Sequence, residues 1–210
     1  MRQKNSSRGK GILFILLAAF FFSMMSVFVR LSGNVPTMQK AFFRNIVAAF
    51  VAAVLLVRSG EKIAIRKESL SSLFMRSIFG TAGILANFWA VDHLGIADAN
   101  MLNKLSPFFA ILMSVFILKE IPNRIEWLSV LLAFIGAAFV AKPSTGIISI
   151  PALIGIFGGF AAGTAYTFVR KLGLQGVRGP LVVTFFSSFS TLFDFIKSTV
   201  NRALVKIFIF

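Results

Sequence analysis

Seven long apolar segments, separated by short polar links, constrain this 210-residue chain more than any other feature. A helix needs about 20 largely apolar residues to cross the hydrocarbon core of a bilayer, and the fifth and seventh segments are somewhat shorter. The segments lack the strict alternation of a membrane-barrel strand. We therefore predict an all-α integral membrane protein, a polytopic bundle of about seven transmembrane helices. The segments are Gly11–Leu31, Thr37–Val57, Leu73–Val91, Ala97–Leu118, Glu126–Ala141, Ile150–Val169 and Pro180–Ile196.

The composition excludes most soluble protein classes. Only 14% of the residues are charged, whereas a soluble domain carries about 25%. The absence of cysteine and the single histidine exclude a disulfide scaffold and Cys- or His-based metal sites. The net charge of +15 comes from basic residues between the apolar segments, so we expect no nucleic-acid partner. No phosphate-binding loop or hydrolytic triad is recognisable, and we predict neither an enzyme nor a bound cofactor.

The distribution of Lys and Arg predicts the orientation. Thirteen of them precede the first segment or follow the second, fourth and sixth, and three lie on the other side. Cytoplasmic loops carry the excess of basic residues. We therefore expect a multi-pass protein of the cell membrane whose amino terminus is cytoplasmic, with lipid as its surroundings.

Two parts of the chain resemble each other. A Phe-Val-Arg sequence ends one helix, a proline opens the next, and a Phe-Phe pair follows. A repeat unit of five spans would place the second copy upside down, and inverted repeats are typical of secondary transporters. Chance similarity between apolar residues is the alternative interpretation. The matching residues are Phe28–Arg30, Pro36 and Phe42-Phe43 in one copy, and Phe168–Arg170, Pro180 and Phe185-Phe186 in the other.

Several motifs together resemble the EamA-type transporters of the drug/metabolite transporter superfamily. The resemblance covers roughly residues 11–190, and it implies ten helices in two inverted five-helix halves that carry small metabolites. The motifs are Gly11–Arg30, Phe42-Phe43-Arg44-Asn45, Leu94–Ala99, Ser106-Pro107-Phe108-Phe109, Leu118-Lys119-Glu120 leading into Ile135-Gly136-Ala137, and Ala165-Tyr166.

The resemblance also divides the chain into parts. Residues 11–141 correspond to a first five-helix repeat, and residues 148–196 to an incomplete second repeat of two helices. The family has three more spans after the seventh, so the chain looks truncated there. In residues 197–210 the apolar side chains fall on one face, which fits an interfacial helix. A frame-shifted or artificial terminus is the alternative for this tail.

The fourth segment holds the strongest substrate-binding candidates. Lys104 lies well inside it, and Asn100, Asn103 and Pro107 share its face by helical spacing. An ionisable group within a span is costly and points to function, and Pro107 predicts a kink. We expect a polar patch that receives an anionic or hydrogen-bonding solute. The alternative, which we rate lower, is that Lys104 extends to the membrane surface.

Other spans add weaker candidates. Asn87 is expected to find a partner across a helix interface or in a cavity. Tyr166 either reaches a midplane cavity, which the family resemblance favours, or belongs to an interfacial aromatic belt. Arg44 either meets the substrate or extends to the outer surface, with equal weight. For Arg76 extension to the cytoplasmic surface is the favoured interpretation. Asp194, the acid of the seventh segment, is a candidate proton acceptor if that segment is helical.

Two functions remain. The leading one is a secondary transporter, an exporter or permease, for a small organic metabolite such as an amino-acid-like or nucleoside-like solute, working by alternating access. The alternative is a truncated, non-transporting membrane protein or a subunit that requires self-association as a homodimer.

Overall fold

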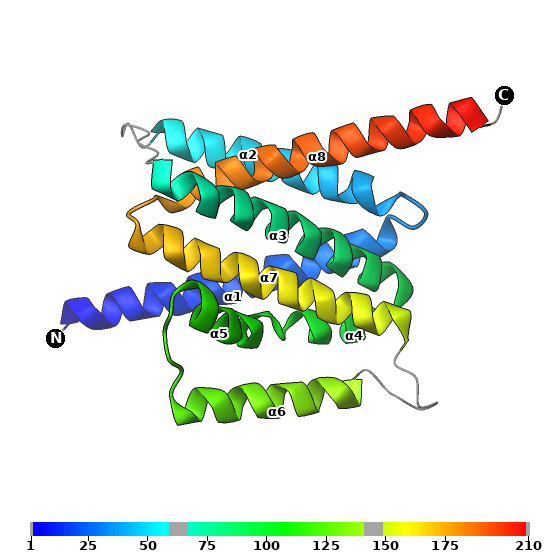
Figure 1. The fold of residues 1–210 in the computed structure, drawn as a ribbon. Coiled ribbons are helices and arrows are strands. Elements are labelled where there is room, and N and C mark those ends of the chain that lie inside the picture. Colours follow the sequence, from blue (N-terminus) through cyan, green and yellow to red (C-terminus); the bar gives the residue numbers. More distant parts are fainter. Residues whose placement is uncertain (1, 59–66, 141–148, 209–210) are drawn as a thin grey trace.

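The computed structural model describes residues 2–58, 67–140 and 149–208, and these residues form only helices and short links (Figure 1). The predicted all-α polytopic fold is confirmed. Six segments are long and apolar enough to cross a membrane, and they match all the predicted spans except the fifth. The helices are α1 (Arg2–Leu31), α2 (Thr37–Arg58), α3 (Lys67–His93), α4 (Ile96–Asn103), α5 (Ser106–Ile117), α6 (Arg124–Val140), α7 (Ile150–Leu174) and α8 (Gly179–Phe208).

The fourth predicted span consists of two helices, because the helix is interrupted at Lys104 and Leu105. Pro107 lies in the first turn of α5, where its missing N–H costs no intrahelical bond. At the predicted kink the helix is thus interrupted by a two-residue turn, whose backbone stays in the right-handed helical region. This turn ends α4 inside the bundle rather than at its edge.

The centre of the bundle is the antiparallel pair α3 and α7 (Figure 1). The helices approach closely because small residues face each other. A Cβ atom added at Gly83 would lie 3.1 Å from the backbone nitrogen of Ala162, and one at Gly158 would lie 3.3 Å from the Cβ of Ala86. These contacts show that the glycines of α7 serve helix packing, as glycines do in membrane helices generally.

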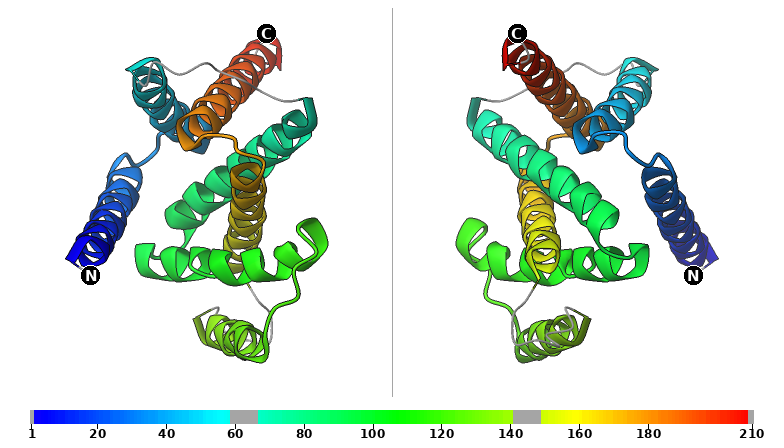
Figure 2. Two further views of the ribbon diagram at one scale, coloured as in Figure 1. Left: turned by 90° about the vertical axis from the view of Figure 1, so that its left-hand side faces the viewer. Right: turned by 90° about the vertical axis from the view of Figure 1, so that its right-hand side faces the viewer.

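The opposite face of α7 receives α4 and α5, so α7 lies between them and α3 (Figure 2). A Cβ atom at Gly159 would lie 2.9 Å from the carbonyl oxygen of Leu102. At Gly163 it would collide with the carbonyl oxygen of Ser106. Two glycines therefore bring the interrupted span against the central helix.

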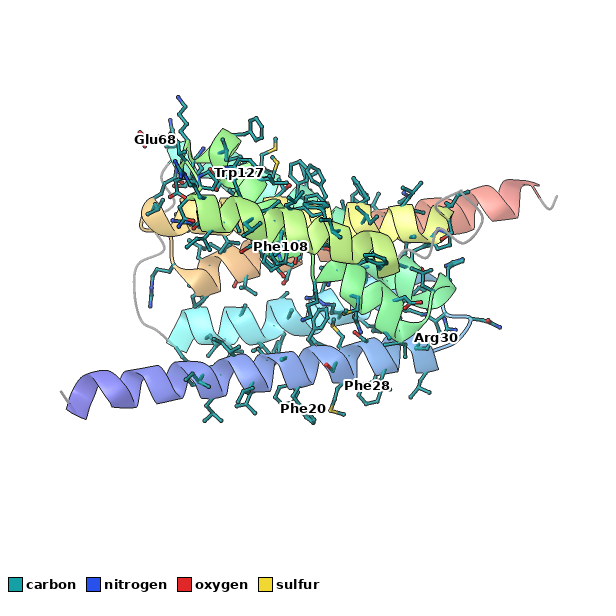
Figure 3. All side chains as sticks on the ribbon, turned by 90° about the horizontal axis from the view of Figure 1, so that it is seen from below. Phe20, Phe28, Arg30, Glu68, Phe108 and Trp127 are labelled. Carbon is teal, nitrogen blue, oxygen red and sulfur yellow. The ribbon has the colours of Figure 1, made fainter. Side chains whose placement is uncertain are left out.

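Helices α1 and α6 lie at the periphery (Figure 2). Apolar side chains of α1 are exposed, for example Phe14 at 67% and Ile15 at 70%, and Phe20 points away from the other helices (Figure 3). Helix α6 begins with reciprocal hydrogen bonds, in which the Asn123 N–H donates to Glu126 Oε2 and the Glu126 N–H to Asn123 Oδ1. The exposed apolar side chains of α1 suit contact with lipid.

Helix α8 packs antiparallel to α2 and continues past Ile196, the predicted end of the seventh span. Residues 197–208 are therefore a direct extension of this span, while residues 209–210 lie outside the described residues. That the extension is interfacial or an aberrant terminus stays a prediction.

Candidate functional site

A cavity of about 150 Å³ lies inside the bundle, between α1, α2, α3, α4, α7 and α8. Aromatic, aliphatic and small residues form most of its wall. Five polar side chains also line it, and four of them were predicted site residues. The five are Arg44, Arg76, Asn87, Asn103 and Tyr166.

Arg76 lies in this cavity, and the expectation that it extends to the cytoplasmic surface was wrong. Its guanidinium carbon is 4.1 Å from the centre of the Phe186 ring. Its Nε and Nη1 atoms are buried and have no hydrogen-bond partner. The physical reason is Gly80, one helical turn further along α3, where a Cβ atom would collide with Arg76 Nη1. The missing side chain leaves room for the arginine to lie along its own helix.

Arg44 also lines the cavity, which favours the first of its two predicted alternatives over extension to the surface. Its Nη1 donates a hydrogen bond of 2.7 Å to Oδ1 of Asn45. This bond uses only part of the hydrogen-bonding capacity of the guanidinium. The charge of Arg44 is costly within a span unless it is compensated.

Asn45 connects Arg44 to a buried polar cluster between α2 and α8. Its Nδ2 donates to Ser190 Oγ at 2.6 Å and to Asp194 Oδ2 at 3.2 Å. All three of these side chains are fully buried, and Asp194 Oδ1 has no hydrogen-bond partner. Sequence reasoning missed Asn45, although its position next to Arg44 within an apolar span was a usable signal.

Three further predicted residues lie at the cavity. Asn87 is 6% exposed, and its Oδ1 has no hydrogen-bond partner. Asn103, the last residue of α4, lines the cavity because the helix ends there. Tyr166 lies on α7 and lines this cavity and a second one.

Lys104 and Asn100 do not belong to the lining of the 150 Å³ cavity. Lys104 follows Asn103 directly, in the turn after α4. Lys104 is exposed, with its Nζ 5.1 Å from the centre of the Phe22 ring, and Phe22 itself lines the cavity. Asn100 accepts a hydrogen bond of 3.2 Å from Ser26 on α1. The structure therefore places Lys104 one side chain away from the cavity.

The second cavity, of about 440 Å³, lies near the carboxyl ends of α5 and α7. Glu120, Glu126 and Arg170 line it, together with Tyr166. An ion pair of 2.9 Å joins Arg170 to Glu120, and both side chains are well exposed. Tyr166, which is 52% exposed, thus lines both cavities.

At the opposite end of the bundle, Lys40 of α2 forms an ion pair of 2.7 Å with Asp92 of α3. The Lys40 side chain is only 3% exposed. Arg30, at the end of α1 (Figure 3), donates to the carbonyl oxygens of Val91 and Asp92 at 2.9 and 2.6 Å. These contacts join three helices at this end. Sequence reasoning did not predict this pair.

The central cavity combines hydrogen-bonding side chains with apolar walls. Two guanidinium groups, two amides and a phenol face a space with apolar walls. Within the described ranges, no three His, Asp or Glu side chains are grouped to hold a metal ion.

The chain is similar in sequence to known membrane transport proteins. Residues 9–142 match the model of the EamA-like transporter family. The pseudopaline exporter CntI of Pseudomonas aeruginosa is 32% identical over 168 residues, which cover 79% of this chain and 58% of the exporter. An uncharacterized transporter of Helicobacter pylori is 26% identical over 167 residues, 77% of this chain and 55% of that protein.

A mammalian protein is also similar. Solute carrier family 35 member G1 of Mus musculus is 25% identical over 142 residues, 68% of this chain and 39% of the carrier. The chain thus spans between about two fifths and three fifths of the length of these relatives. No solved structure gives a significant match.

Proposed function

Since the chain belongs to the EamA-like transporter family, we propose that it takes part in secondary transport of a small organic metabolite across the cell membrane by alternating access. One observation carries this proposal: a cavity inside a bundle of apolar helices is lined by Arg44, Arg76, Asn87, Asn103 and Tyr166. Polar groups within spans mark the paths of solutes in membrane proteins.

The residues at the two ends of the bundle support a proposal about the side of the membrane from which the solute enters. With the amino terminus in the cytoplasm, the 440 Å³ cavity faces the cytoplasm and the pair of Lys40 and Asp92 lies at the outer side. In the proposed cycle this arrangement is the state open to the cytoplasm, and Tyr166, which lines both cavities, lies on the path between them. A solute enters past Tyr166 and leaves when the outer contacts open. This direction is that of an exporter, the activity named for the similar protein of Pseudomonas aeruginosa.

The packing of α2 against α8 supports an inverted repeat. The sequence repeat makes these helices equivalents, within the proposed units 11–141 and 148–196. They run antiparallel, since Phe42 contacts Phe195 while Asn45 contacts Ser190. Two helices that are related by a two-fold axis in the membrane plane run antiparallel to each other, as these do.

Lys104 and Asn100 extend the proposed site beyond the cavity. The ammonium of Lys104 lies against Phe22 at the cavity wall, and a rotation of this ring would bring the charge to the solute. We assign both residues to the path by which the solute approaches.

A homodimer that completes the bundle is the second candidate. It is favoured by α1, whose long apolar helix has few contacts and an exposed face. Cross-linking in native membranes through single cysteines on α1 tests it, since the chain has no cysteine of its own.

Transport is tested by reconstituting the full chain in liposomes and screening a panel of labelled metabolites by counterflow. At least one small metabolite is expected to exchange faster than in empty liposomes, and more slowly after Lys104→Ala. Exchange at the rate of empty liposomes for every metabolite would contradict the proposal.

A further inference from the structure

We propose that the central cavity recognises the carboxylate of its solute through Arg44 and Arg76, and an adjacent N–H or O–H group through Asn87. The solute is then a small amino or hydroxy acid. This inference rests on the proposed transport function and adds the substrate class.

Charge is the first argument. Arg44 and Arg76 bring two guanidinium groups to one cavity of about 150 Å³, and none of its described lining residues is acidic. A guanidinium stays protonated in proteins, so this positive charge persists within the membrane. Placing charges there without counter-ions costs free energy. A bound anion removes this cost.

Unused hydrogen-bonding capacity is the second argument. Arg76 Nε and Nη1 are buried without a partner. The Arg76 guanidinium rests on the face of Phe186, a contact that holds its plane but uses no N–H group. Arg44 is different, because Asn45 accepts one of its bonds and leads to Asp194. The vacant donors of Arg76 therefore match an oxyanion, and a planar carboxylate matches a planar guanidinium especially well.

Asn87 restricts the chemical class of the solute further. Its Oδ1 is a buried acceptor without a partner, on the same helix as Arg76 and about two helical turns beyond Gly80, beside which the Arg76 guanidinium lies. An acceptor left unpaired in a buried site costs free energy, and a donor of the solute satisfies it. The solute thus carries an anionic group and a hydrogen-bond donor.

The volume of the central cavity limits the size of the solute. At about 150 Å³ the cavity is smaller than the pockets of about 300–1,000 Å³ that bind drug-sized ligands, so it suits a small solute. Three-carbon acids such as alanine and lactate have this size and the required groups. They provide matched probes, since their amides differ only at the carboxylate.

The experiment measures the midpoint of thermal unfolding of the full chain in detergent against increasing L-alanine, L-lactate, L-alaninamide, L-lactamide or inorganic phosphate. We expect the two acids to raise the midpoint and the amides to have little effect. Arg76→Gln and Arg44→Gln are each expected to weaken the apparent affinity for the acids about tenfold or more. Arg124→Gln, which removes an exposed charge, should leave it unchanged. Arg76→Lys, which keeps the charge but not the planar fork, should be intermediate.

Several results would overturn the inference. They are equal effects of acids and amides, stabilisation by phosphate alone, no effect of any probe, or unchanged affinity in both glutamine variants. If a glutamine variant fails to fold, unchanged affinity in Arg76→Lys is decisive. Counterflow in liposomes separates the two proposals. Acids that bind without exchanging would refute transport and leave the inference intact, whereas transport of neutral solutes alone would refute the inference and leave transport intact.

Discussion

The guanidinium of Arg76 occupies the space that a side chain at Gly80 would fill. A Cβ atom there would collide with Arg76 Nη1 and lie 2.8 Å from the Phe186 ring. One glycine therefore determines where a charged group lies within the bundle.

We expect Gly80→Ala to displace the Arg76 guanidinium without removing its charge, and so to slow exchange in liposomes about tenfold. Gly136→Ala is the matched control, since nothing lies within 4 Å of a Cβ at Gly136. Initial rates of counterflow provide the measurement. Equal rates for both variants would show that the position of Arg76 is unimportant.

Close packing between α7 and α5 predicts a stability effect. Gly163→Ala brings a methyl group 2.7 Å from the Cβ of Phe109 and 2.9 Å from the backbone nitrogen of Ala110. Overpacking of this kind costs about 1–3 kcal/mol. Gly173→Ala, on the same helix with nothing within 4 Å, should be neutral or stabilising. Thermal unfolding in detergent compares the two, and a midpoint for Gly163→Ala at or above the control would contradict the packing.

The buried cluster of α2 and α8 predicts a second stability effect. Asn45→Ala removes the hydrogen bonds to Ser190 and Asp194 and leaves these groups unpaired. Each unpaired buried group costs about 1–3 kcal/mol. Asn34→Ala, at an exposed position of the link between α1 and α2, is the control. Indistinguishable unfolding midpoints for the two variants would rule out a structural role of the cluster.

The two ion pairs should differ in strength. The pair of Lys40 and Asp92 is largely shielded, whereas Arg170 and Glu120 are 62% and 38% exposed. A double-mutant cycle to alanine should give a coupling energy of about 1–3 kcal/mol for the first pair and about 0–1 kcal/mol for the second. Equal coupling energies would show that the first pair does not hold the helices together.

The sequence predicted most of the helices because apolar length is a property of single segments. It could not predict that α4 ends at Asn103, since Pro107 is equally compatible with a kinked helix. Of the two residues at this interruption, Asn103 lines the central cavity and Lys104 is exposed.

The positions of the arginines depended on neighbours distant in the chain. Arg76 is held in the cavity by Gly80 and Phe186, and Phe186 comes from another helix. Spacing within α3 indicates that Gly80 shares a face with Arg76, but not that this face is turned inward. The pair of Lys40 and Asp92 was missed for the same reason, because their two helices meet only in the fold.

The most direct test of the central claim is the reaction of a single cysteine at Ile84 with a membrane-impermeant maleimide. Ile84 lines the central cavity, and the chain contains no other cysteine. Phe50→Cys, at a 71% exposed apolar position of α2, is the lipid-facing control. The account predicts that Ile84→Cys reacts from the cytoplasmic side, reacts from the outer side when the transporter turns over, and that Phe50→Cys reacts from neither. An Ile84→Cys thiol as unreactive as the control would contradict the claim that this cavity is a water-filled path for a solute.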